Sequence, residues 1–218
     1  MDGKRAGCMW EAIGDLAPSK QPSFRVVLSV VALSVIAPIN SEAQSATQSQ
    51  ILASCESCHG ARGDSHVTST PRLNGQQPEF IVKRLEEFSG LARTDPHAEI
   101  AMLKGLAPDN DANRGAIAQY FASQRPTSPT PGAYAAEGRN IYENGIAAEN
   151  VVACKQCHGS LGEGHGPAPR IAGQHADYLN TQLRLFNIKF REHALMNPNT
   201  KTMTRKTMEA LTSYLASD

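Results

Sequence analysis

The sequence predicts an all-α protein built from two tandem copies of one small domain. The motif Cys-Glu-Ser-Cys-His-Gly at 55–60 recurs 99 residues later as Cys-Lys-Gln-Cys-His-Gly at 154–159. A second motif, Pro-Arg-Leu-Asn-Gly-Gln at 71–76, recurs 98 residues later as Pro-Arg-Ile-Ala-Gly-Gln at 169–174. After these motifs apolar residues recur with helical spacing, and the alternating runs typical of strands are scarce. A nearly constant offset over two motifs indicates a duplicated unit.

Each copy contains two segments with the apolar spacing of an amphipathic helix. The first segment has Ile81, Leu85 and Phe88 in one copy and Leu179, Leu183 and Phe186 in the other. The closing segment has Ile117, Tyr120 and Phe121 in one copy and Met208, Leu211 and Leu215 in the other. A further helix is expected before the second cysteine motif, around 138–142. Its counterpart in the first copy, at 44–54, lacks a glycine equivalent to Gly138 and is expected to be truncated.

The boundary between the copies is marked by composition. Residues 125–132 read Arg-Pro-Thr-Ser-Pro-Thr-Pro-Gly, and three prolines among small polar residues predict a semi-extended linker. We therefore predict a first copy at 44–124, a linker at 125–132 and a second copy at 133–218.

The first 43 residues resemble an export signal. Lys20 and Arg25 precede an apolar run at 26–37, and small residues follow it up to Ala43. The run is shorter than the roughly 20 residues of a membrane span. We predict a signal peptide at 1–43 with cleavage after Ala43, or alternatively after Ala46. An uncleaved membrane anchor and a buried helix are the other interpretations.

The composition limits the classes of function. Lys plus Arg and Asp plus Glu both number 21, so net charge does not favour nucleic acid as a partner. No Ser/His/Asp pattern, H-E-x-x-H motif or Gly-rich phosphate loop is present, which favours a protein that is not an enzyme. Aromatic residues make up 6% of the chain, which is few for two small independent cores. Domains of this size usually need an added stabilising element.

The paired C-x-x-C-H motifs predict that this element is haem. The two thiols of such a motif bond to the haem vinyl groups, and the adjacent histidine is placed to ligate the iron. We therefore predict two covalently bound haem c groups, attached at Cys55, Cys58, Cys154 and Cys157. His59 and His158 are the predicted iron ligands. The alternatives are disulfides, a thioredoxin-like redox pair and a zinc site made from both cysteine pairs.

The second axial ligand is expected from methionine. Met102 precedes Tyr120 by 18 residues, and Met196 precedes Tyr214 by 18, so these two methionines occupy equivalent places in the repeat. Methionine ligation raises the reduction potential relative to a second histidine. A core position is the alternative for each.

Five other histidines are less favoured as ligands. His97 and His193 are rivals because each lies just upstream of its methionine, although at unequal distances. His66, His165 and His175 are interpreted as surface or loop histidines.

Two further pairs have roles in the repeat. Pro71 and Pro169 either offer carbonyl oxygens to the ligand histidines, whose second ring nitrogen usually needs an acceptor, or are plain turn prolines. Gly75 and Gly173 are expected to permit a close backbone approach before the amphipathic helix.

These motifs resemble those of the dihaem class I cytochromes c of the cytochrome c-four type, over roughly residues 48–218. The resemblance implies two class I cytochrome c domains related by a pseudo-twofold axis, with the haem propionates facing each other. It implies His59 and Met102 on the first iron, and His158 and Met196 on the second. One departure is the spacing from Cys55 to Met102, 47 residues, against 42 from Cys154 to Met196.

The resemblance implies a periplasmic electron carrier that is soluble or peripherally bound to the membrane. Such proteins pass electrons from a cytochrome bc complex to a terminal oxidase through transient contacts with membrane proteins. The alternatives are the electron-accepting subunit of a dehydrogenase, or an enzyme in which one haem has a labile sixth ligand.

Overall fold

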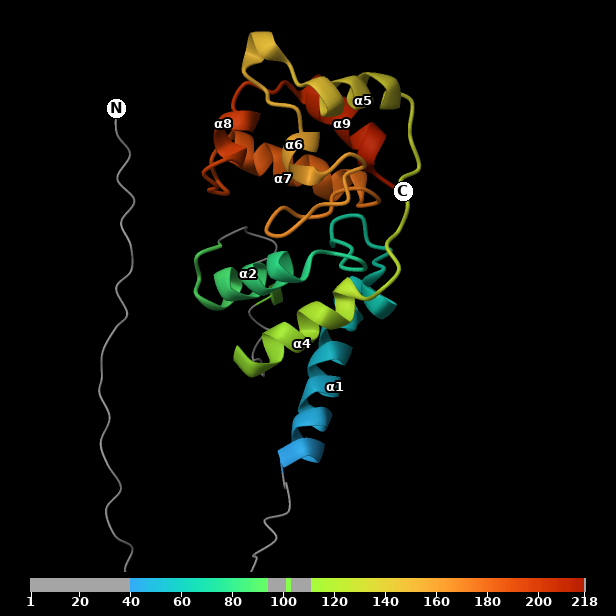
Figure 1. Ribbon diagram of the computed structural model, residues 1–218, viewed down its shortest axis with the longest axis vertical. Coiled ribbons are helices and arrows are strands. Elements are labelled where there is room, and N and C mark those ends of the chain that lie inside the picture. Colours follow the sequence, from blue (N-terminus) through green and yellow to red (C-terminus); the bar gives the residue numbers. More distant parts are fainter. Residues whose placement is uncertain (1–39, 94–100, 103–110, 218) are drawn as a thin grey trace, which may run out of the picture. The chain divides into compact units, whose positions relative to one another are not determined.

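The computed structural model describes residues 40–93, 101–102 and 111–217, and these residues form a helical protein (Figure 1). Residues 1–39 of the expected signal peptide at 1–43, and the rival ligand His97, lie outside the described residues. The helices of the first copy are α1 (Asn40–His59), the short 3-10 helix η1 (Ala61–Gly63), α2 (Pro78–Ser89) and α4 (Asp111–Ala122). Those of the second copy are α5 (Ala135–Asn144), η2 (Ala147–Glu149), α6 (Lys155–His158), α7 (Ala176–Asn187), α8 (Met196–Thr200) and α9 (Arg205–Leu215). The described ranges contain isolated β-bridges but no strand, in agreement with the all-α prediction.

The predicted amphipathic helices are confirmed. Helix α2 has Pro78 in its first turn, where a missing N–H costs nothing, and it buries Ile81, Leu85 and Phe88. Helix α9 is capped by Thr204, whose hydroxyl accepts a hydrogen bond of 3.1 Å from the Thr207 N–H. Each copy therefore buries its apolar stripes in a core of its own.

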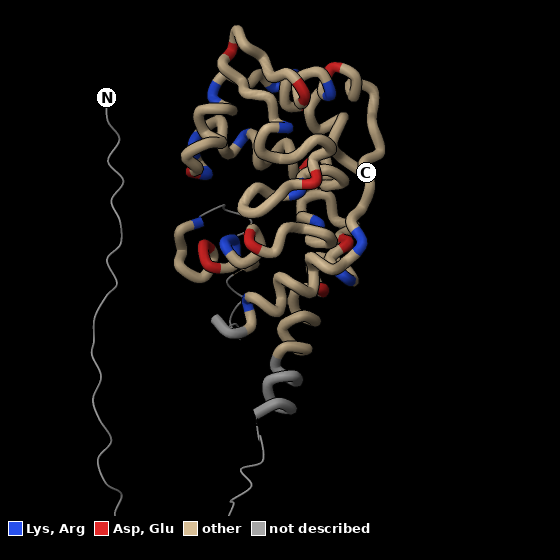
Figure 2. The backbone as a smooth tube through the Cα atoms, in the orientation of Figure 1, with Lys and Arg blue, Asp and Glu red and all other residues tan. Residues whose placement is uncertain are grey.

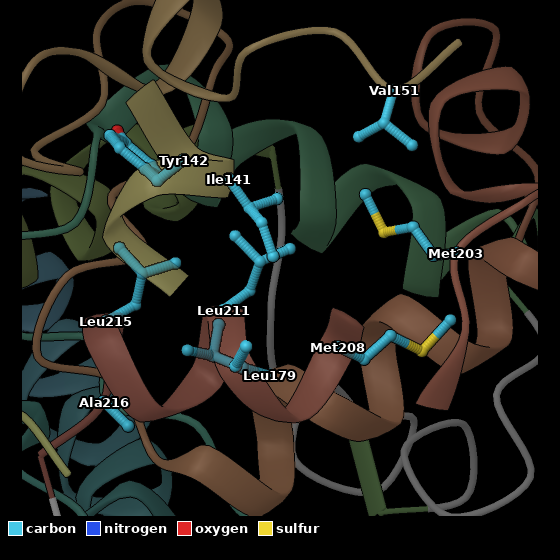
Figure 3. Packing of buried hydrophobic residues seen from close by; sticks show 10 residues of the cluster. Ile141, Tyr142, Val151, Leu179, Met203, Met208, Leu211, Leu215 and Ala216 are labelled. Atoms are coloured by element: carbon cyan, nitrogen blue, oxygen red, sulfur yellow. The ribbon is translucent and has the colours of Figure 1, made fainter. Parts of the chain in front are cut away.

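The two cores have the same layout. In the second copy α5, α7 and α9 enclose the cluster shown in Figure 3, with Ile141, Tyr142, Leu179, Leu211 and Leu215 among its buried members. In the first copy α1, α2 and α4 enclose the equivalent cluster, which contains Ile51, Ile81, Leu85, Phe88, Ile117, Ala118 and Phe121.

The expectation of a truncated helix in the first copy is wrong. Helix α1 spans 20 residues and runs without a break into the cysteine motif. In the second copy Gly145, at φ +71°, ends α5, and the chain then turns through η2 before α6 begins. Residues 44–54 contain no glycine or proline to stop the helix. The absence of a counterpart to Gly138, which lies inside α5, therefore does not shorten the first helix.

Reciprocal hydrogen bonds join the two copies. The Gln76 amide accepts from the Arg170 N–H at 2.7 Å and donates to the Arg170 carbonyl at 2.9 Å. The Gln174 amide does the same with Arg72, at 2.8 and 3.0 Å. Each glutamine thus satisfies the backbone of the arginine from the other copy's repeated motif. Such exchange is the signature of an isologous, twofold-related interface.

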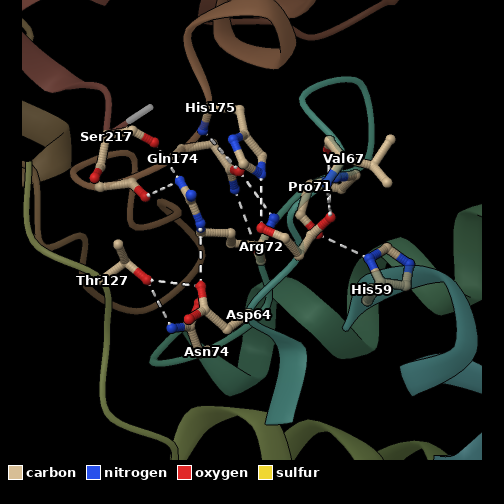
Figure 4. A network of polar contacts seen from close by, with 12 residues as sticks. His59, Asp64, Val67, Pro71, Arg72, Asn74, Thr127, Gln174, His175 and Ser217 are labelled. Carbon is tan, nitrogen blue, oxygen red and sulfur yellow. Dashed lines mark hydrogen bonds and ion pairs between the residues drawn. The ribbon is translucent and has the colours of Figure 1, made fainter. Parts of the chain in front are cut away.

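His175 corrects the interpretation of the histidines. His66 and His165 are exposed, as expected for surface residues. His175 is only 2% exposed, and its Nε2 lies 2.9 Å from the Ser65 carbonyl oxygen of the other copy (Figure 4). Its counterpart in the repeat, Gln77, also crosses the interface and donates to the Glu163 carbonyl at 2.9 Å. Both residues directly follow an interface glutamine, and this shared position was the signal available in the sequence.

Residues 125–132 are held by both copies. The Asn74 amide donates to the Arg125 carbonyl and to the Thr127 hydroxyl, at 3.0 and 2.9 Å. The Thr130 N–H donates to the Ala216 carbonyl at 2.8 Å. The segment is therefore a fixed part of the interface, which a semi-extended linker alone does not require.

The predicted close approach of the two motif glycines is confirmed, and the segment approached is 126–127. A Cβ on Gly75 would meet Pro126 Cβ at 2.6 Å, and one on Gly173 would meet the Thr127 carbonyl oxygen at 1.9 Å. Gly173 also has φ +76°.

We expect Gly173→Ala to destabilise the protein strongly. The new methyl group displaces residue 127, at about 1–3 kcal/mol for overpacking, in addition to about 1–2 kcal/mol of left-handed backbone strain. Gly166→Ala is the matched control, because Gly166 has φ +53° but open space around its Cα. Denaturant unfolding of both variants measures the difference. If both variants lost the same free energy of unfolding, residues 126–128 would have to move aside at no energetic cost.

Candidate functional site

Both cysteine motifs lie on one turn of helix. The first forms the last turn of α1, and in the second Cys154 precedes α6 directly. Cys55 and Cys154 are partly buried and Cys58 and Cys157 are exposed, so the two motifs have the same exposure pattern. Within the described residues none of the four cysteines forms a disulfide. Among the described residues no three His, Cys, Asp or Glu side chains gather as a metal-binding group, so the two cysteine pairs build no zinc site there.

The two motif histidines are buried and oriented alike. His59 Nδ1 lies 2.8 Å from the Pro71 carbonyl oxygen (Figure 4), and His158 Nδ1 lies 2.9 Å from the Pro169 carbonyl oxygen. A carbonyl can only accept, so Nδ1 carries the proton and the Nε2 lone pair is left for a ligand. The expected histidine–proline contact is confirmed in both copies.

Burial lowers the pKa of His59 and of His158, although the hydrogen bonds to the proline carbonyls act in the opposite direction. Both imidazoles are therefore held neutral, which is the form that binds a metal. The donor set suits iron in a haem.

The two candidate methionines are each partly buried. Met102 packs against the core of the first copy, and Met196 is the first residue of α8. Met203 and Met208 are only 6% and 3% exposed and belong to the core of the second copy. The register pair Met102 and Met196 is thus distinct from the two core methionines.

His193 is bound to the backbone that carries Met196. Its Nδ1 accepts hydrogen bonds from the N–H groups of Leu195 and Met196 at 3.2 and 3.3 Å. Its ring packs edge-on against the Phe186 ring, with the ring centroids 6.1 Å apart. Because Nδ1 accepts these hydrogen bonds, Nε2 carries the proton of the neutral ring and offers no lone pair to a metal. This arrangement favours Met196 over His193 as the ligand.

The interface between the copies offers cationic donors to an anionic group. Arg170 Nε is buried and has no hydrogen-bond partner within the described residues, and burial lowers the pKa of this guanidinium. Arg72 lies opposite and is held by Asp64 at 3.2 Å and by the Ser217 carbonyl at 2.6 Å (Figure 4). A buried donor atom is costly unless an acceptor reaches it. Haem carries two propionates, so these residues fit that cofactor.

Comparison with known proteins places this geometry in a family. A family model described as cytochrome c matches residues 135–217. Cytochrome c-552 of Acidithiobacillus ferridurans is 36% identical over 172 residues, covering 77% of this chain and 75% of the relative. The solved structure of cytochrome c4 from Acidithiobacillus ferrooxidans has a TM-score of 0.71 and 36% identity, covering 75% of this chain and 98% of the other. The chain belongs to the cytochrome c4 family.

Membership of this family establishes the fold class and the cofactor of the chain. The cytochrome c4 family has two class I cytochrome c domains, and its members carry two covalently bound haem c groups. This chain is therefore an electron carrier of the cytochrome c4 type. The thiosulfate dehydrogenase electron acceptor of Thiomonas intermedia is also similar, at 32% identity over 174 residues, covering 75% of this chain and 78% of that relative. Within its described residues the chain has no helix that is both long enough and apolar enough to cross a membrane.

Proposed function

We propose that the two haems are attached at Cys55 and Cys58, and at Cys154 and Cys157. His59 and Met102 ligate the first iron, and His158 and Met196 the second. The observation that carries this proposal is the pair of buried histidines, each with Nδ1 fixed by a proline carbonyl. When bound, haem supplies the one-electron chemistry, and the chain's own residues orient it and exclude water. The proposed domains are 44–124 and 133–218, joined by 125–132.

The proposed role is to carry electrons in the periplasm between a cytochrome bc complex and a terminal oxidase. Export is assigned to the segment 1–43. Both signs of charge are spread over the two copies (Figure 2). This distribution suits brief contacts with more than one partner, and redox encounters bury little surface. The second candidate is the electron-accepting subunit of a dehydrogenase, which the similarity to thiosulfate dehydrogenase electron acceptors favours.

An anaerobic spectroscopic redox titration of the haem-loaded protein tests the ligands. We expect two low-spin haems, both with fairly high potentials, because methionine ligation raises the potential. A high-spin component, or one much lower potential, would contradict methionine ligation at that iron. Met102 would be abandoned first, since its loop departs from that of the second copy. Co-purification with an oxidase, or with a flavin or quinoprotein dehydrogenase, separates the two candidate roles.

A further inference from the structure

Glu56 lies between the two cysteines of the first motif, and its side chain is fixed in place. Its Oε1 accepts a hydrogen bond from the Tyr120 hydroxyl at 2.6 Å and another from the Arg62 N–H at 2.7 Å. Tyr120 comes from α4, at the far end of the copy, and Arg62 lies in η1 directly after the motif. Two donors on one oxygen hold the carboxylate beside the motif.

Two charge-assisted hydrogen bonds fix the Glu56 carboxylate in one place beside the motif. The hydrogen bond to Glu56 is the largest of the causes that raise the pKa of Tyr120. Arg62 contributes its backbone N–H, and its exposed guanidinium acts on Tyr120 in the opposite direction and more weakly. A partly buried, immobilised negative charge therefore sits inside the first motif.

The second copy has the opposite charge at this place. The repeat offset of 99 residues puts Lys155 where the first copy has Glu56. The tyrosine is retained as Tyr214, but it packs against Tyr142 with ring centroids 5.6 Å apart. Lys155 is exposed. The two motifs thus differ by two charge units at one position, while the cysteines, the histidine and the proline contact are the same.

We propose that Glu56, held by Tyr120, sets the potential of the first haem below that of the second, and that Lys155 widens the difference. This inference rests on the proposed attachment sites. Oxidation adds one positive charge at the iron, so a fixed negative charge nearby favours the ferric state and a positive charge disfavours it. Glu56 is partly buried and rigid, and Lys155 is solvated, so solvent and salt screen Lys155 more. In the half-reduced protein the electron resides mainly on the second haem.

The test is a redox titration of Glu56→Gln and Lys155→Gln in the haem-loaded full chain. Glutamine keeps the shape of Glu56 and can still accept both hydrogen bonds. We expect Glu56→Gln to raise the lower potential and leave the higher one in place. Lys155→Gln should lower the higher potential by a smaller shift, which shrinks as salt is added. Each variant is expected to shift a different one of the two reduction potentials. The two titrations together therefore assign each potential to its haem.

Tyr120→Phe tests the positioning role. Without the hydroxyl donor the carboxylate turns toward solvent, so the lower potential should rise, but by less than in Glu56→Gln. Tyr214→Phe is the matched control in the second copy and should move neither potential.

Haem attachment and reduction potentials together distinguish a failure of this inference from a failure of the proposed function. The mass of the denatured chain reports how many haems are covalently attached. Two attached haems whose potentials do not move in Glu56→Gln would overturn the inference and leave the attachment sites intact. A first motif that carries no haem in the unmodified protein would overturn the proposed function itself.

Discussion

Replacing Met196 by alanine should lower the reduction potential of the second haem and open its iron to added ligands. Methionine on the sixth position raises the potential relative to nitrogen or oxygen ligands. Axial ligands tune haem potentials over about 0.8 V, so a loss on the order of 0.1 V or more is expected. Met196 begins α8, and its N–H donates to His193 Nδ1. The Asn197 side chain accepts from the His193 N–H, so the loop should keep its shape when the Met196 side chain is removed. Optical spectra with and without added cyanide or imidazole report the open position.

Met203→Leu is the matched control for Met196→Ala. Met203 lies in the core of the same copy and is 6% exposed. A swap of similar volume there should cost little stability and leave the potential unchanged. If Met196→Ala had the spectrum and potential of the unmodified protein, the ligand would have to be another residue. His193 would then be the first to examine.

Removing both thiols of the second motif should leave the chain with one covalent haem. In Cys154→Ala/Cys157→Ala no sulfur remains to form a thioether there, and the mass of the denatured chain should fall by one haem. The single variant Cys157→Ser keeps one thioether, so its attachment should be weakened and restricted to the second copy. Cys154 is partly buried against the core of its copy, so losing the haem should also destabilise that core.

The equivalent double variant of Cys55 and Cys58 is the control for the second motif. It should remove the other haem and leave the second in place. Limited proteolysis shows which copy has lost its structure, so a poorly folded variant still gives an answer. If either double variant kept two covalent haems, the assignment of one haem to each motif would be wrong.

The similarity of the two copies was accessible from sequence because it lies in short-range patterns. A C-x-x-C-H motif is complete within five residues, and a helical turn brings its side chains together wherever the helix is placed. The apolar spacing of Ile81, Leu85 and Phe88 likewise needs only the 3.6-residue period of a helix. These local patterns determined the all-α class, the duplication and the cofactor.

The length of the helix before each motif could not be predicted from local patterns, because it depends on the conformation of the whole segment. The second copy has Gly138 inside α5, and residues 44–54 of the first copy contain no glycine. This absence predicted a truncated helix, whereas the lack of a helix breaker lets α1 continue into the motif. Propensity alone does not say whether a helix without a stop signal extends or frays, because tertiary packing decides.

The sequence by itself determined the two cysteine–histidine motifs, the methionines in register and the helices around them. Only the tertiary structure decided what joins the copies, namely the exchange between Gln76 and Arg170 and between Gln174 and Arg72. It also decided the contact of Glu56 with Tyr120, 64 residues further along the chain. These contacts link residues that no local period relates. Their partners become neighbours only when the chain has folded, because hydrogen bonds of this kind depend on distance and direction in space.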